Sequence, residues 1–119
     1  MTEITNKIYN LEDRTLEFAK AVIRLANKLP KILVNIELIR QVCRSAASIG
    51  ANYREANEAL GKKDFIYRIS ISRKETKETT YWLELILEAN PDFKPYVEPL
   101  LQESKELRNI FTSIINKSK

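Results

Sequence analysis

The chain has 119 residues, 44% of them hydrophobic, which is enough for one domain with its own core, and its two glycines and four prolines are too few for the turns of an all-β fold. It contains no histidine, which excludes Ser-His-Asp and Cys-His catalysis and histidine-liganded metal sites. The formal net charge of +4 permits contact with nucleic acid and does not require it.

The composition also limits where the protein can reside in the cell and which reactions it can catalyse. No apolar run reaches the roughly 18 residues of a membrane span, and the first ten residues lack the apolar centre of a signal peptide. A single cysteine, Cys43, fits a reducing compartment, and it is expected to pack as a small buried hydrophobe. We therefore expect a cytoplasmic protein without membrane contact. Because the chain lacks histidine, and because Gly50 and Gly61 alone cannot form a phosphate-cradling loop, we also expect no enzyme activity, no metal and no other cofactor.

The first half of the chain predicts two helices. Apolar residues recur every three or four positions over 11–29, with Asn10 as the expected N-cap and Pro30 as the stop. The same periodicity follows over 35–60, with Asn35 as the expected N-cap and Gly61 as the stop.

The second half repeats the pattern. The third helix is predicted over 64–89 with Asp64 as its cap, and the fourth over 95–117 with Pro95 at its first position. Four amphipathic helices with short connections predict an all-α fold, an antiparallel up-down-up-down four-helix bundle that forms a single domain over residues 1–119.

Small and hydroxylated residues interrupt the apolar stripes of the second and third predicted helices. A buried network of hydrogen bonds and ion pairs that fixes the packing is the favoured interpretation, and a ligand or catalytic pocket is the alternative. The sequence leaves open whether this layer lies within one subunit or between subunits. Its expected members are Arg44, Ser48, Asn52, Glu55, Arg73, Glu75, Thr76 and Thr79.

The end of the third helix, residues 81–87, is apolar nearly all round. A helix of that kind is buried on more than one side, which indicates a subunit interface. The expected interface residues are Tyr81, Trp82, Leu85 and Leu87.

Basic residues are the candidates for nucleic-acid contact. Lys20, Arg24 and Lys28 are spaced by four on the first helix, which places them on one face. An ordinary solvated face is one interpretation, and contact with phosphates is the other. The full candidate set is Lys20, Arg24, Lys28, Lys31, Lys62 and Lys63.

Two stretches carry a family resemblance. They read RSAASIGANYREA at residues 44–56 and RKETKETTYWL at residues 73–83, and the leader LEDRT at 11–15 accompanies them. Together they resemble the bacterial four-helix-bundle proteins encoded in intervening sequences of 23S ribosomal RNA genes. The resemblance implies an up-down bundle and a homopentameric ring, because known relatives form such rings. A related barrel, the accessory protein of diversity-generating retroelements, binds reverse transcriptase and nucleic acid. The family offers no catalytic residues to carry over.

These observations lead to one hypothesis and one alternative. The hypothesis is a non-catalytic homo-oligomer, expected to be a pentamer, that acts as an adaptor associated with RNA or DNA and could also contact another protein. The alternative is a structural protein–protein scaffold without nucleic-acid binding. Charge reversal on the first helix separates the two.

Overall fold

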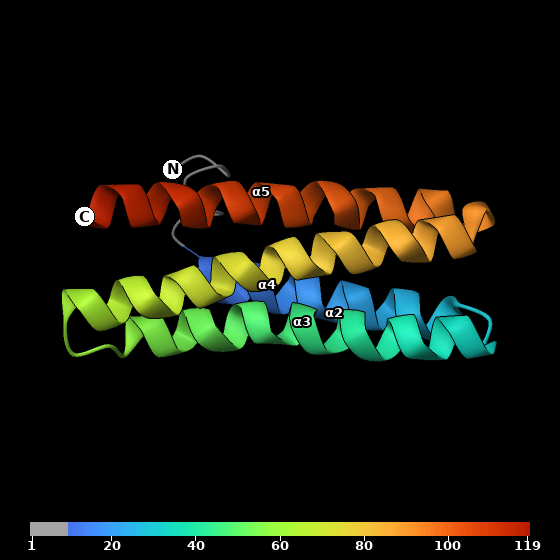
Figure 1. Cartoon of the computed structure of the whole chain (residues 1–119), viewed down its shortest axis with the longest axis horizontal. Helices are drawn as coiled ribbons and strands as arrows, with labels where there is room; N and C mark the ends of the chain where they lie inside the picture. Colours follow the sequence, from blue (N-terminus) through green and yellow to red (C-terminus); the bar gives the residue numbers. More distant parts are fainter. Residues whose placement is uncertain (1–9) are drawn as a thin grey trace.

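The computed structural model describes residues 10–119 and shows four long α-helices in that range, with no strand among the described residues (Figure 1). These are α2 (Leu11–Lys28), α3 (Leu33–Asn57), α4 (Lys62–Ala89) and α5 (Lys94–Ser118), and a short 3₁₀ turn, η1 (Pro91–Phe93), precedes α5. The expected all-α four-helix fold is confirmed. Residues 1–9, where we expect no signal peptide, lie outside the described residues.

The helices lie side by side along a long axis of 45 Å, and their connections alternate between the two ends of the molecule (Figure 1). Contacts near the helix ends agree with this arrangement. Asn57 at the end of α3 donates a 2.9 Å hydrogen bond to Glu12 at the start of α2. Asn35 near the start of α3 bonds Asn90 directly after α4. The most extensive packing is between α3 and α4.

One apolar core runs through the four helices. Each helix contributes residues spaced by three or four positions, as the periodicity of the sequence predicts. Burying side chains of this size stabilises the fold by about 1.5–3 kcal/mol each. The largest fully buried apolar side chains are Leu11, Val22, Leu29, Val42, Ile49, Ile69, Leu83, Ile86, Val97, Leu107 and Phe111.

The expected helix starts are partly wrong. α3 begins at Leu33 after an extended Ile32, so Asn35 is not its cap but a buried residue of the first turn. α4 begins at Lys62 after an extended Gly61, so Asp64 is not the cap but a residue of the first turn. Its negative charge there interacts favourably with the positive end of the helix dipole. Asn10 occupies the N-cap position of α2 without a side-chain capping bond. In each case tertiary contacts or backbone geometry, rather than a capping side chain, set the boundary.

The interface between α2 and α3 depends on a close approach at Gly50. A Cβ atom at this position would lie 2.9 Å from Thr15 Oγ1 and 3.2 Å from Thr15 Cβ. Real Cβ atoms do not approach other heavy atoms so closely, so the absence of a side chain lets the two helices meet here. α2 is thereby held against α3 at a point near the start of α2 and in the second half of α3.

Candidate functional site

Buried hydroxyl pairs connect three of the helices. Ser45 on α3 and Thr79 on α4 share a 2.8 Å hydrogen bond, and Thr80 on α4 shares a 2.7 Å bond with Ser104 on α5. Ser72 donates to the carbonyl of Ile49 at 2.9 Å. Each of the paired hydroxyl groups also has a carbonyl of its own helix within hydrogen-bonding distance. Hydroxyl pairs satisfied in this way fix the register of α3, α4 and α5 and leave none of their hydroxyl hydrogens without an acceptor.

The predicted polar layer is only partly buried. Thr76 and Thr79 are fully buried and Glu75 is 8% exposed, whereas Ser48, Asn52 and Arg73 are half-buried. Arg44 and Glu55 lie at the surface. The Arg44 side chain is 60% exposed and its Nη2 atom lies 3.7 Å from Glu78 Oε1, a geometry in which an ion pair contributes little. The expected buried charge network therefore does not include Arg44 or Glu55.

Glu75 lies in a polar seam between α3 and α4. Ser48 donates to its Oε2 atom at 3.3 Å, Asn52 donates to the Ser48 hydroxyl at 3.0 Å, and Arg68 donates to Asn52 at 3.4 Å. The other carboxylate oxygen, Oε1, is buried and has no hydrogen-bond partner among residues 10–119, and the same holds for Trp82 Nε1. The seam joins two helices of one chain, and Arg68 is a member that the sequence pattern did not indicate.

The basic residues of α2 lie on its exposed face. Lys20 pairs with Glu17 at 3.2 Å, and Lys28 places its Nζ atom 5.5 Å from the ring centre of Tyr96. Arg24 is exposed and has no ion-pair partner in the described part of the chain. All three side chains therefore present their charge to solvent.

The other basic candidates lie elsewhere. Lys31 donates to the carbonyl oxygens of Ala26 and Leu29, so it caps the C-terminus of α2 rather than facing solvent freely. Lys62 and Lys63 open α4 at the opposite end of the molecule (Figure 1). The structure thus brings Lys20, Arg24 and Lys28 together and separates them from Lys62 and Lys63.

Among the places where large apolar side chains reach the surface, two regions bear on assembly. At the predicted interface, Tyr81 is 56% exposed and packs edge-to-face on Trp82, while Trp82, Leu85 and Leu87 are half-buried. The second region was not predicted: α2 and the start of α3 expose several large aliphatic side chains. The signal for it in the sequence is the run KILVNIELI at residues 31–39, which spans the connection between the first two predicted helices and the start of the second. The exposed residues are Leu16, Ile23, Ile32, Leu33, Val34 and Ile36.

Two open grooves follow α4. The first, of about 420 Å³, runs along α4 itself, and the second, of about 510 Å³, lies between the end of α4 and the start of α5. The first is lined by Ser70, Arg73, Lys74, Lys77, Glu78, Tyr81 and Trp82. The second is lined by Glu84, Leu87, Glu88, Pro91, Lys94, Glu98 and Leu101.

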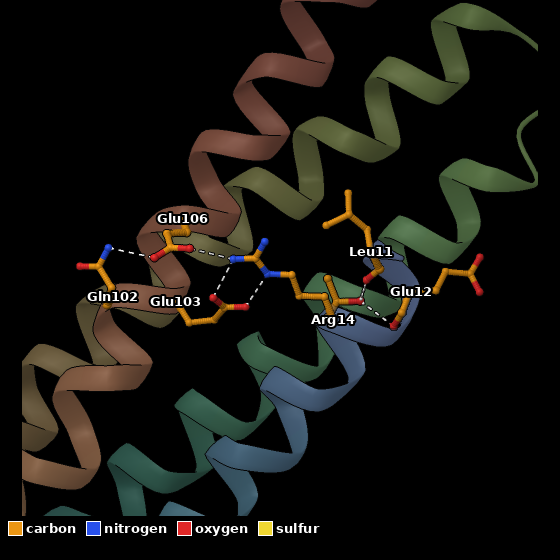
Figure 2. Close-up of polar contacts among 7 residues, drawn as sticks. Leu11, Glu12, Arg14, Gln102, Glu103 and Glu106 are labelled. Carbon is orange, nitrogen blue, oxygen red and sulfur yellow. Dashed lines mark hydrogen bonds and ion pairs between the residues drawn. The ribbon is translucent and has the colours of Figure 1, made fainter. Parts of the chain in front are cut away.

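Arg14 connects α2 to α5, as Figure 2 shows. Its Nε and Nη2 atoms donate to both carboxylate oxygens of Glu103 at 2.7 and 2.8 Å, and Nη2 also donates to Glu106 at 2.9 Å. The hydrogen bond to Glu103 raises the pKa of Arg14, with smaller contributions from Glu106, against the opposing effect of burial. No sequence pattern indicated this cluster, because Arg14 lies 89 positions from Glu103 and 92 positions from Glu106.

Residues 10–119 contain no group of three or more acidic or cysteine side chains arranged to hold a metal ion. Among these residues, no helix is both long and apolar enough to cross a membrane. Burial raises the pKa of the Cys43 thiol, so this side chain is less ionised than an exposed cysteine.

Comparison with known proteins identifies the family. The profile described as 23S rRNA-intervening sequence protein matches residues 6–113. The chain belongs to this family. A crystal structure of a protein with unknown function, from the S23 ribosomal protein family of Bacteroides thetaiotaomicron VPI-5482, is similar to it with a TM-score of 0.77 and 35% sequence identity. That similarity covers 87% of this chain and 96% of the other. No curated protein matches the chain.

Membership confirms the resemblance seen in residues 44–56 and 73–83. In this chain those residues form the adjoining parts of α3 and α4, and they supply the buried hydroxyl pair Ser45–Thr79 and the polar seam at Glu75. The Bacteroides protein is described as one of unknown function, so the comparison supplies no catalytic residue.

Proposed function

We propose that this chain is a non-catalytic, homo-oligomeric adaptor in the cytoplasm that contacts structured RNA through its phosphates. The observation that carries the proposal is the exposed row of Lys20, Arg24 and Lys28 on α2. Phosphate contact requires positioned positive charge and no base-specific geometry, which is what such a row offers.

The row is available without disturbing the fold. Successive members lie one helical turn, about 6 Å, apart. The pair between Lys20 and Glu17 is solvent-exposed and contributes little, so a phosphate can compete for the lysine. Lys28 keeps its charge above the Tyr96 ring, and Arg24 has no competing carboxylate among the described residues. Binding would therefore cost little rearrangement.

Oligomerisation supports the same proposal by multiplying weak contacts. One row of three cations gives a modest affinity for any polyanion. Several rows on one assembly bind a folded RNA together, because the second contact becomes intramolecular once the first has formed. A pentamer, as the family resemblance implies, would present five rows.

RNA binding is tested by fluorescence anisotropy with a labelled ribosomal RNA hairpin at low ionic strength. The variant Lys20→Glu/Arg24→Glu/Lys28→Glu is expected to bind at least about tenfold more weakly. Its logarithmic salt slope should fall by roughly 0.7–0.9 per lost phosphate contact. The matched control Lys74→Glu/Lys77→Glu/Lys105→Glu reverses three other exposed lysines and is expected to lose less affinity.

Light scattering on both variants should give the same mass as the unmodified chain, which separates lost binding from lost assembly. If the unmodified chain fails to bind the hairpin at low ionic strength, or if the α2 variant binds as the control does, the RNA-binding proposal is wrong.

A structural scaffold without nucleic acid is the second candidate. The observation that favours it is the exposed aliphatic surface at the start of α3, where Leu33 is 79% exposed. Surfaces of this kind indicate contact with another protein surface. Under this reading, the α2 reversal changes no RNA measurement, whereas a change at the aliphatic surface alters the solution mass.

A further inference from the structure

The groove between α4 and α5 presents unpaired acidic groups over an apolar floor. Leu87 and Leu101 are half-buried in it, and Glu84, Glu88 and Glu98 are exposed around them. Glu98 lies 3.8 Å from Lys94, but Glu84 and Glu88 have no ion-pair partner in residues 10–119. We refer to these five residues as the α4–α5 groove. Its chemistry fits a cationic partner that also carries aliphatic side chains.

The exposed side of α3 has the complementary chemistry. Leu33, Ile36, Arg40 and Arg44 follow one another at intervals of three and four, so they share one face of the helix, and all four are exposed. Within residues 10–119, Arg40 pairs only with its neighbour Glu37, at 3.2 Å and with both side chains more than half exposed. We refer to these four residues as the α3 outer face. It combines two aliphatic side chains with two weakly engaged guanidinium groups.

The two surfaces lie at the same level along the molecule. Hydrogen bonds between Asn35 and Asn90, and between Ser45 and Thr79, fix the register of α3 against α4. Between these two pairs, each step forward along α3 corresponds to about one step backward along α4. Arg40 therefore lies level with Glu84, and Ile36 lies level with Glu88.

They also lie on different sides of the molecule. Ile36 belongs to the row of every seventh residue that includes Gly50 and Asn57, both of which meet α2. The groove instead lies where α4 meets α5, and Figure 1 shows α3 and α5 at opposite edges of the fold. One chain can therefore use both surfaces at once. A contact between two different surfaces at equal height repeats around an axis and can close into a ring.

We propose that the α4–α5 groove of one copy receives the α3 outer face of a second copy of this chain. Arg40 meets Glu84, Ile36 packs on Leu87 at the level of Glu88, and Arg44 and Leu33 extend the contact along the groove on either side. The inference rests on the homo-oligomer of the proposed function and names the surfaces that form it. It leaves the basic row of α2 outside the interface and free for phosphates.

Solution mass under charge reversal tests the pairing. Arg40→Glu/Arg44→Glu and Glu84→Lys/Glu88→Lys are each expected to reduce the assembly to the 13.8 kDa chain. Their combination on one chain restores opposite charges and is expected to restore the wild-type mass. The control Glu55→Lys/Glu58→Lys reverses two exposed carboxylates at the other end of α3 and should leave the mass unchanged. Thermal melting checks that each variant is folded, and Leu33→Glu gives an independent disruption.

The outcomes are distinct. If the unmodified chain is an oligomer and both reversals keep its mass, the pairing is wrong while the proposed function stands. If either reversal dissociates the assembly and the combined variant does not reassemble, the two surfaces do not face each other and the pairing is again wrong. A chain that is monomeric at all concentrations overturns both the pairing and the oligomeric part of the proposed function, and the anisotropy measurement then judges RNA binding separately.

Discussion

Asn35 and Asn90 form a reciprocal amide pair in which each side chain donates a 2.8 Å hydrogen bond to the carbonyl oxygen of the other. The second N–H of Asn35 donates to the carbonyl of Pro30, and that of Asn90 to the carbonyl of Ile86, both at 2.9 Å. Both residues are buried. The pair therefore ties the turn between α2 and α3 to the end of α4 with every amide hydrogen engaged.

Replacing one member of this pair is expected to destabilise the fold. Asn35→Ala leaves buried polar atoms of the Asn90 amide unpaired, which costs about 1–3 kcal/mol for each unsatisfied group. Asn35→Leu/Asn90→Leu removes both partners and should cost less than the two single leucine changes together, because no amide is left without a partner.

Urea denaturation of the two single leucine variants and the double variant measures this coupling. Asn109→Ala, at an exposed position of α5, is the control and should change the free energy of unfolding by less than about 0.5 kcal/mol. Additive effects of the single changes would show that the amide pair is not a unit.

The sequence predicted the helices well and this pair not at all, for a physical reason. A helical stripe such as Ile39, Val42, Ala46 and Ile49 repeats locally, so its period can be read without knowledge of its partners. An asparagine before a helix has the same local pattern whether it caps that helix or is buried against a distant residue. Asn35 bonds to a residue 55 positions away, and no local pattern contains that information.

The candidate site likewise has features that the sequence predicted and features that it could not predict. The spacing of Lys20, Arg24 and Lys28 placed them on one exposed face, because helical period and charge are local properties. The sequence could not show that Lys31 turns back to cap α2, or that Arg44 lies at the surface beside Glu78, since both depend on tertiary geometry. The level match between Arg40 and Glu84 likewise depends on the register of two helices.

The Arg14 cluster predicts a difference between arginine and lysine. Arg14 engages both oxygens of Glu103 with two nitrogens, and its side chain is largely buried. A lysine offers one point charge in place of this fork, so Arg14→Lys should lower the free energy of unfolding by roughly 1–2 kcal/mol. Arg54→Lys, at an exposed position near the end of α3, is the control and should change it by less than about 0.5 kcal/mol. Chemical denaturation compares the two, and equal effects would mean that the fork adds nothing to a simple charge pair.

Gly50 predicts a steric cost that outweighs helix propensity. By intrinsic helix propensity alone, Gly50→Ala should raise the free energy of unfolding by about 1 kcal/mol, because the position lies inside α3. The new Cβ, however, meets Thr15, whose hydroxyl group donates a 2.7 Å bond to the carbonyl of Leu11 and cannot move away freely. Overpacking of this kind costs about 1–3 kcal/mol, so we expect net destabilisation.

Thermal melting checks the expectation against Gly61→Ala, a position where a Cβ meets nothing within 4 Å. Adding Thr15→Ala to the Gly50 variant should recover part of the loss, because it removes the oxygen that lies closest. A Gly50→Ala variant that is more stable than the unmodified chain would show that α2 and α3 can separate at no cost.

Cys43 predicts a loss of stability at alkaline pH. Burial raises the pKa of its thiol in the folded chain, so on the alkaline side the unfolded chain releases this proton before the folded chain does. The sign follows from linkage: the contribution is fully present below the pKa of the unfolded thiol and is lost as pH rises through the folded value. The window therefore opens above about pH 8.5, where exposed thiols ionise. The informative quantity is the difference between the melting curves of the unmodified chain and Cys43→Ala, because contributions that the two proteins share cancel in it. As pH rises, the melting temperature of the unmodified chain should fall relative to that of Cys43→Ala. A difference that stays constant from neutral to alkaline pH would mean that the thiol ionises equally in the folded and unfolded states.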